Sequence, residues 1–132
     1  MSFARDIAIR TVFMEASGSG APGMKAVCHV LWNRLHSGRW GSNLTAVCLW
    51  PEQFSCWNTS DPNRLRLARE PEDSPILFSI GMMLDAAANE ADFTQGATHY
   101  YDPDSVLHEP PWAAGATNTG QWGGQLFFSG VK

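Results

Sequence analysis

A stripe of apolar residues along one helical face is the feature that most constrains the fold. Its members recur at i, i+3, i+4, i+7 and i+11: Met24, Val27, Cys28, Leu31 and Leu35. This spacing is typical of an amphipathic helix that buries one side. Pro22 suits a first helical position and Gly38 suits a helix end, so the sequence predicts a helix from Pro22 to about His36.

Further helices are predicted on both sides of this stripe. They are Phe3 to Ala16 with Ser2 as a cap, Leu44 to Leu49 stopped by Pro51, a helical turn around Asn63 to Arg69, and a helix that opens at Ser74-Pro75 and fades near Glu90. The glycine-serine stretch 17–20 ends the first of them. Capping residues before an apolar periodic run, and proline at its first position, support these starts.

The pattern changes after residue 96. Ala97 to Tyr101 reads as a strand, and Gln125 to Phe128 reads as a closing strand. Between them we expect a turn at 102–104, an extended loop at Pro110-Pro111-Trp112, and a glycine-rich turn from Thr117 to Gly124. Helices first and a small β region last predict an α+β fold that is mainly helical.

Length and charge limit the classes of protein. The 132 residues, 44% of them hydrophobic, suit one domain, residues 1–132, around one core. The net charge of −4 without a run of Lys or Arg argues against nucleic-acid partners and against stable membrane association. The sequence contains no run of 18 apolar residues, so we predict no membrane-spanning helix. The N-terminus lacks the pattern of a signal peptide.

Cysteine and tryptophan usage add two expectations. Cys28, Cys48 and Cys56 have no zinc-site spacing and form an odd number, so we expect free thiols in a reducing cytoplasm. Six tryptophans are many for this length. Some belong to the core, and the others suit a groove in which flat ligands such as sugar rings stack.

Glu15 is the candidate catalytic residue. It is the only carboxylate between Asp6 and Glu52, and it lies among apolar neighbours at the end of the first helix, before a flexible glycine-serine stretch. Apolar surroundings disfavour the ionised carboxylate, so we expect a raised pKa and a proton available for general acid catalysis. A solvated carboxylate near a helix end is the alternative interpretation.

Candidate binding residues lie in three other segments. The loop Gln53-Phe54-Ser55 could hold N-acetyl and hydroxyl groups, with Phe54 equally suited to the core. In the strand, Tyr100 is expected to point toward the site and Tyr101 away from it, because side chains alternate. Trp112 could stack on a ring. Asn33 is a candidate substrate ligand, or a structural residue together with Arg34.

A cluster of histidines and acids runs from residue 99 to residue 109: His99, Asp102, Asp104, His108 and Glu109. A metal-dependent amidase or peptidase that uses His99 and His108 is therefore an alternative function. The spacing is not one that zinc sites favour, and we predict no metal. A wall-binding module without catalysis is the remaining alternative.

Several motifs, taken in order, resemble the SleB-type cell wall hydrolase family. They are Glu15-Ala16, Gly23-Met24-Lys25-Ala26-Val27, Asn33-Arg34, Gln53-Phe54-Ser55, Gly96-Ala97-Thr98-His99-Tyr100, Pro111-Trp112-Ala113 and Gly123-Gly124-Gln125-Leu126-Phe127. The family often carries a second Glu in the first turn, where this chain has Gly18-Ser19-Gly20. It also carries a histidine where this chain has Gln125.

The resemblance implies a lysozyme-like fold and an enzyme that degrades peptidoglycan. We also expect the protein to be a monomer. It implies a lytic transglycosylase that cuts between N-acetylmuramic acid and N-acetylglucosamine, leaves a 1,6-anhydro end, and uses Glu15 as general acid and base without a cofactor. His99 then joins the candidate substrate ligands. A chain without a signal peptide fits a phage endolysin, which stays in the cytoplasm until its release to the wall. A phage particle component or a bacterial enzyme exported by another route also fits.

Overall fold

The structure, a computed structural model, describes residues 3–50, 54 and 74–132. Four of its helices follow the predicted pattern: α1 (Phe3–Ala16), α2 (Gly20–Ser37), α3 (Leu44–Leu49) and α5 (Pro75–Ala87). A short 3-10 helix, η1 (Ser17–Ser19), joins α1 to α2. The helical turn predicted around 63–69 lies outside the described residues.

The ends of the helices follow the expected capping chemistry. Gly38 ends α2 in a left-handed conformation with φ of 74°, and its N–H donates to the Leu35 carbonyl at 3.2 Å. The Asn43 side chain caps α3 by accepting from the Ala46 N–H at 2.9 Å. The second helix begins at Gly20 rather than Pro22, which leaves the proline within the first turn, where a missing N–H breaks no helical hydrogen bond.

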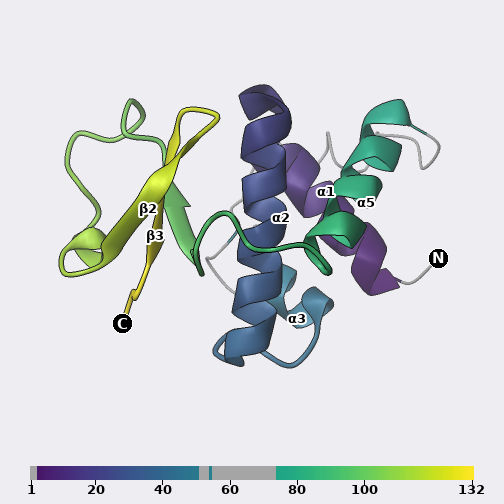
Figure 1. Cartoon of the computed structure of the whole chain (residues 1–132), viewed down its shortest axis with the longest axis horizontal. Coiled ribbons are helices and arrows are strands. Elements are labelled where there is room, and N and C mark those ends of the chain that lie inside the picture. The colour runs from purple at the N-terminus through teal and green to yellow at the C-terminus, as the bar shows by residue number, and fades with distance from the viewer. Residues whose placement is uncertain (1–2, 51–53, 55–73) are drawn as a thin grey trace.

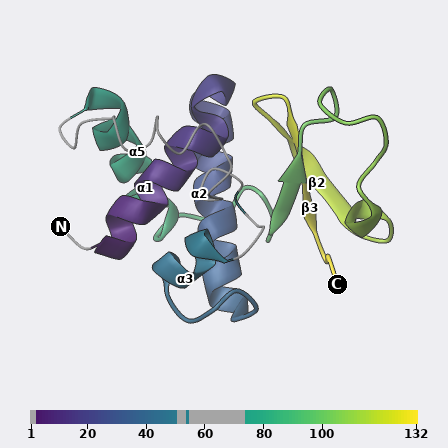
Figure 2. The same cartoon turned by 180° about the vertical axis from the view of Figure 1, so that it is seen from behind.

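Helix α2 stands between the sheet and the pair α1 and α5 in both views (Figures 1 and 2). Its predicted apolar stripe is buried at Met24, Val27, Cys28 and Leu31. These side chains belong to one core cluster with residues of α1, α3 and α5. None of the helices in the described part of the chain is long and apolar enough to cross a membrane.

The β region is a three-stranded antiparallel sheet of β1 (His99–Tyr101), β2 (Thr117–Trp122) and β3 (Gln125–Ser129), in the order β1-β3-β2. A mainly helical α+β fold is therefore confirmed. The prediction of a turn over Thr117 to Gly124 was wrong, because residues up to Trp122 pair with β3 and leave the turn to Gly123 and Gly124. Hydrogen bonding to β3 stabilises the extended conformation of this segment, which its glycine-rich sequence does not favour by itself.

The predicted extended loop at Pro110-Pro111-Trp112 was wrong in part. Pro111–Ala113 form a 3-10 helix, η3, in which the Ala113 N–H donates to the Pro110 carbonyl at 2.9 Å. Pro111 takes the first helical position, where the absence of its N–H breaks no bond.

Two glycines bring the β2–β3 turn against the start of α2. A Cβ on Gly123 would lie 2.5 Å from the Ser19 Cβ, 2.6 Å from the Ser19 carbonyl oxygen and 3.0 Å from the Gly23 Cα. A Cβ on Gly23 would meet the Ser19 Cβ at 2.5 Å. Only residues without side chains permit so close a backbone approach. The sheet is thus docked on the segment that directly follows Glu15.

We expect Gly123→Ala to lower the free energy of unfolding by about 3 kcal/mol, because the methyl group would enter this contact at a positive φ of 61°. Gly124→Ala is the matched control: its φ is 84°, yet nothing lies within 4 Å of its Cβ position. Its cost should be limited to backbone strain, about 1 kcal/mol. Urea unfolding of both variants measures the difference, and equal losses would contradict docking through this contact.

Candidate active site

Glu15 lies next to the last residue of α1 and is half-buried. The Tyr100 hydroxyl, from β1, donates a hydrogen bond to Glu15 Oε1 at 3.1 Å. Phe13 and Ala16 beside it are buried in the core. The candidate acid therefore lies where the end of α1 meets the sheet, and its hydrogen bond to Tyr100 joins residues 85 positions apart.

The direction of Tyr100 follows from the strand. Its ring stacks on Phe127, its partner in β3, with centroids 5.2 Å apart and planes at 30°. Phe127 is fully buried and also contacts the Trp122 ring. The prediction that Tyr100 and Tyr101 point to opposite sides is confirmed, because Tyr101 stacks instead on Phe128 in a second apolar cluster.

Arg34 places a buried cation near this contact. Its side chain is buried, its guanidinium carbon lies 4.6 Å from the Trp40 ring centroid and 5.0 Å from that of Phe54, and its Nε donates to the Thr98 carbonyl at 2.7 Å. Burial lowers the pKa of Arg34 to about 10, and attraction to Tyr100, Cys48 and Glu15 opposes that shift. Arg34 is therefore charged at neutral pH and acts electrostatically on the acid and its tyrosine.

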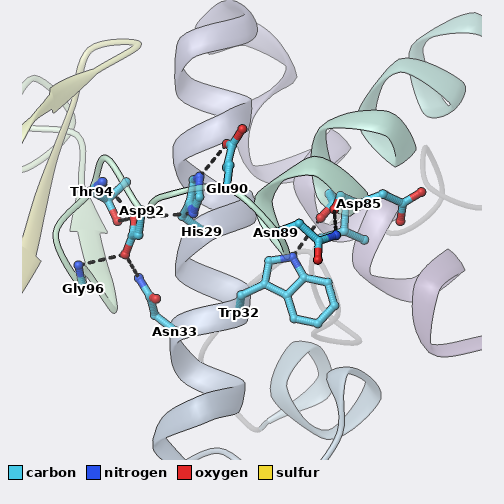
Figure 3. Close-up of polar contacts among 10 residues, drawn as sticks. His29, Trp32, Asn33, Asp85, Asn89, Glu90, Asp92, Thr94 and Gly96 are labelled. Atoms are coloured by element: carbon cyan, nitrogen blue, oxygen red, sulfur yellow. Dashed lines mark hydrogen bonds and ion pairs between the residues drawn. The ribbon is translucent and has the colours of Figure 1, made fainter.

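Asp92 fastens the turn before β1 to helix α2 (Figure 3). Its Oδ2 accepts from Asn33 Nδ2 and from the Gly96 N–H, each at 2.8 Å, and its Oδ1 accepts from the N–H and hydroxyl of Thr94 at 2.8 and 2.6 Å. Burial opposes ionisation, but these hydrogen bonds outweigh it and hold the pKa of Asp92 below its usual value. Asp92 was not among the predicted site residues, although an Asp two residues before a Thr is a local signal for such a turn.

His29 completes this fastening (Figure 3). Its ring is 2% exposed and lies between two carboxylates, with Nε2 2.8 Å from Glu90 Oε1 and Nδ1 3.4 Å from Asp92 Oδ1. The edge of the ring also meets Phe93 at 5.0 Å. Helix α2 therefore holds both sides of the turn that leads into β1.

Asn33 takes part in the same fastening, since its amide nitrogen also donates to the Ala97 carbonyl at 2.8 Å. These bonds favour the structural role that the sequence left open for Asn33, and its contact with substrate stays a prediction. Phe54 is 2% exposed beneath Arg34, which favours its core role. Gln53 and Ser55, the other candidates of that loop, lie outside the described residues.

The remaining aromatic candidates lie on the other face of the sheet. Trp112 contacts the rings of His99, Tyr101 and Phe128, with centroids 5.0, 5.8 and 5.4 Å away. The structure places His99, Tyr101 and Trp112 away from Tyr100, and their contact with substrate stays a prediction. The reason is the pleat of β1, which turns His99 and Tyr101 away from Tyr100.

The described residues offer no ligand set for a metal. No three His, Cys, Asp or Glu side chains within 3–50, 54 and 74–132 gather closely enough to hold an ion. His99 Nδ1 is hydrogen-bonded to the Thr98 hydroxyl at 2.9 Å, and its ring packs near Trp40 and Trp112. Among the described cysteines, Cys28 and Cys48 are free, as expected, and burial raises their pKa values to about 12 and about 11.

Two hollows lie away from Glu15. One, of about 430 Å³, lies among the starts of α1 and α3 and parts of α2 and α5. The other, of about 260 Å³, lies beside η3 and the C-terminal residues. Neither is lined by Glu15 or Tyr100, and neither contributes to the candidate active site.

Burial, together with the charges of Arg34 and Arg39, lowers the pKa of His99 from its usual 6.5 to about 4. The unfolded chain then binds a proton that the folded chain does not, so the stability that His99 contributes is complete above pH 6.5 and is lost as the pH falls toward 4. We expect His99→Phe, which keeps an aromatic ring there, to weaken the pH dependence of unfolding between pH 4 and 6.5. Urea unfolding across that range measures it, and identical slopes for variant and wild type would contradict it.

Comparison with known proteins places the chain in a family. The model of the cell wall hydrolase family matches residues 18–128. Among solved structures, the chain is similar to the catalytic domain of the germination-specific lytic transglycosylase SleB from Bacillus anthracis, with a TM-score of 0.75 and 20% identity over 98% of this chain and 97% of that chain. No curated protein matches the sequence. The structural match includes the end of α1, which the family match, starting at residue 18, does not reach.

The lysozyme-like fold implied by the resemblance is thus confirmed. The family match covers the sequence motifs from Gly23 to Phe127. The chain belongs to the cell wall hydrolase family and is an enzyme that degrades peptidoglycan.

Proposed function

We propose that residues 1–132 act as one catalytic domain that cleaves the glycan strand of peptidoglycan between N-acetylmuramic acid and N-acetylglucosamine, as a lytic transglycosylase. The observation that carries the proposal is the hydrogen bond between Tyr100 and Glu15. It holds a half-buried acid at the junction of helix and sheet, in a fold whose solved relative is named a lytic transglycosylase.

The chemistry needs one acid that also acts as a base. Glu15 donates its proton to the oxygen of the leaving sugar as the bond to the anomeric carbon breaks. The 6-hydroxyl of the muramic acid then bonds to that carbon, and its proton passes to the Glu15 carboxylate. The acid is regenerated, a 1,6-anhydro ring is formed, and no water is consumed.

Tyr100 and Arg34 would support Glu15 in the ionised step. A hydroxyl that donates to the carboxylate stabilises it once the proton has left and keeps its orientation for the second transfer. The buried charge of Arg34 acts in the same direction. Neither residue needs to touch the substrate for these effects.

We expect Glu15→Gln to lower the rate of product release from purified peptidoglycan by at least about 100-fold, because the amide cannot donate an acidic proton. Thermal unfolding checks that the variant stays folded. Glu109→Gln, an exposed acid of the loop before η3, is the control and should keep wild-type activity. Full activity in Glu15→Gln would refute the role of Glu15.

Product masses distinguish the reaction from its alternatives. A transglycosylase leaves anhydromuramic ends that are one water lighter than the reducing ends of a hydrolase. Released peptides with intact glycan strands, together with loss of activity in a strong chelator, would indicate a metal-dependent amidase instead.

Tyr100→Phe should lower the turnover rate by about tenfold with little change in KM, because the ring stack on Phe127 persists while the hydrogen bond to Glu15 is lost. Tyr101→Phe is the matched comparison, because it removes the same atom on the other face of the sheet. Initial rates on solubilised glycan strands measure both. A larger loss of turnover in Tyr101→Phe than in Tyr100→Phe would contradict the proposal, because it would show that the face bearing Tyr101 serves the reaction.

A further inference from the structure

Gln125 carries a polar atom that the fold leaves without a partner. Its Oε1 is buried, and no hydrogen-bond donor reaches it from the described residues. It is the one buried side-chain oxygen or nitrogen of that part of the chain in this condition. A buried carbonyl without a donor costs free energy that an apolar residue of the same size would avoid.

The strand register places Gln125 on the same side of the sheet as Tyr100. Tyr100 pairs with Phe127, and residues two apart in a strand share a face. Gln125 also pairs with Trp122, whose ring packs on Phe127. The carboxamide therefore belongs to the sheet face that meets Glu15.

The residues two positions before and two positions after Gln125 both connect the strand to the segment around Glu15. Two residues before it, Gly123 lies against Ser19 and Gly23, just after Glu15 in the chain. Two residues after it, Phe127 supports the ring of Tyr100, which is bonded to Glu15. Along the strand, Gln125 lies between these two attachments.

We propose that Gln125 binds the substrate: its carboxamide oxygen accepts a hydrogen bond from a sugar N–H or hydroxyl of the glycan strand. Gln125 as a whole is only half-buried, so a change of its side-chain rotamer carries the carboxamide oxygen from its buried position to a bound ligand. A site built to hydrogen-bond a sugar group discriminates against ligands that lack it. This inference rests on the proposed cleavage of the glycan strand.

The test uses the full chain with Glu15→Gln, so that the ligand stays intact. Binding of a tetrasaccharide of alternating N-acetylglucosamine and N-acetylmuramic acid is measured by calorimetry with and without Gln125→Met. We expect Gln125→Met to weaken binding by about tenfold, the loss of roughly one hydrogen bond. Gln121→Met is the matched control: it is the same substitution at an exposed residue of β2 that pairs with Leu126, on the opposite face, and should leave the Kd unchanged.

The Tm of Gln125→Met gives a second test, because a purely structural role of the carboxamide would lower the Tm. Because Gln125→Met removes an unpartnered oxygen, it should keep or raise the Tm, by up to about 3 °C. A Tm several degrees lower would show that the fold itself uses the carboxamide. An unchanged Kd would also overturn the proposal.

Failure of the inference is distinguishable from failure of the proposed function. If the wild type releases anhydromuramic products while Gln125→Met binds as tightly as Gln121→Met, only the role of Gln125 is refuted. If the wild type releases no glycan product and the Glu15→Gln chain does not bind the tetrasaccharide, both proposals are refuted together.

Discussion

The attachment of helix α2 to the turn before β1 is the constraint on which the candidate site depends. Asn33, Arg34 and His29 all project from α2, and they hold Asp92, Ala97 and Thr98 of that turn. Strand β1 begins at the next residue, so these bonds decide where Tyr100 lies. Glu15 approaches the same place from α1, which leads into α2 through a three-residue turn. Helix α2 thus helps to position both Glu15 and Tyr100.

The sheet separates two apolar environments that serve different purposes. One face carries Phe127, Trp122 and Tyr100 against the helical core. The other carries Tyr101, Trp112 and Phe128 in a smaller cluster with residues of η3 and the C-terminal segment. This second cluster stiffens a sheet of three short strands, which on its own would have little stability. Much of the aromatic content of the chain therefore supports the strand that holds Tyr100.

The parts of the site that could be predicted are those with a local signal. Glu15 is an isolated acid at the end of an apolar helix, and Tyr100 occupies an alternating position in a strand, so both could be predicted as candidate site residues from the chain alone. The contacts of Asp92 with Asn33 and of Gly123 with Ser19 and Gly23 were not predicted, because they join residues distant in sequence. Trp112 and Tyr101 were grouped with Tyr100 because they are close in sequence. The sheet places them on its other face.

The sequence by itself determined the described helices, the glycine that ends α2 and the mainly helical class, since periodicity and helix-end signals are properties of neighbouring residues. It also singled out Glu15 as the candidate acid, whose role stays a proposal. The tertiary structure alone decided that Thr117–Trp122 is a strand, that Gly123 meets Gly23, and that Tyr100 reaches Glu15. These features arise when segments far apart in the chain pack together, and their free energy comes from pairing and close approach that no local pattern encodes.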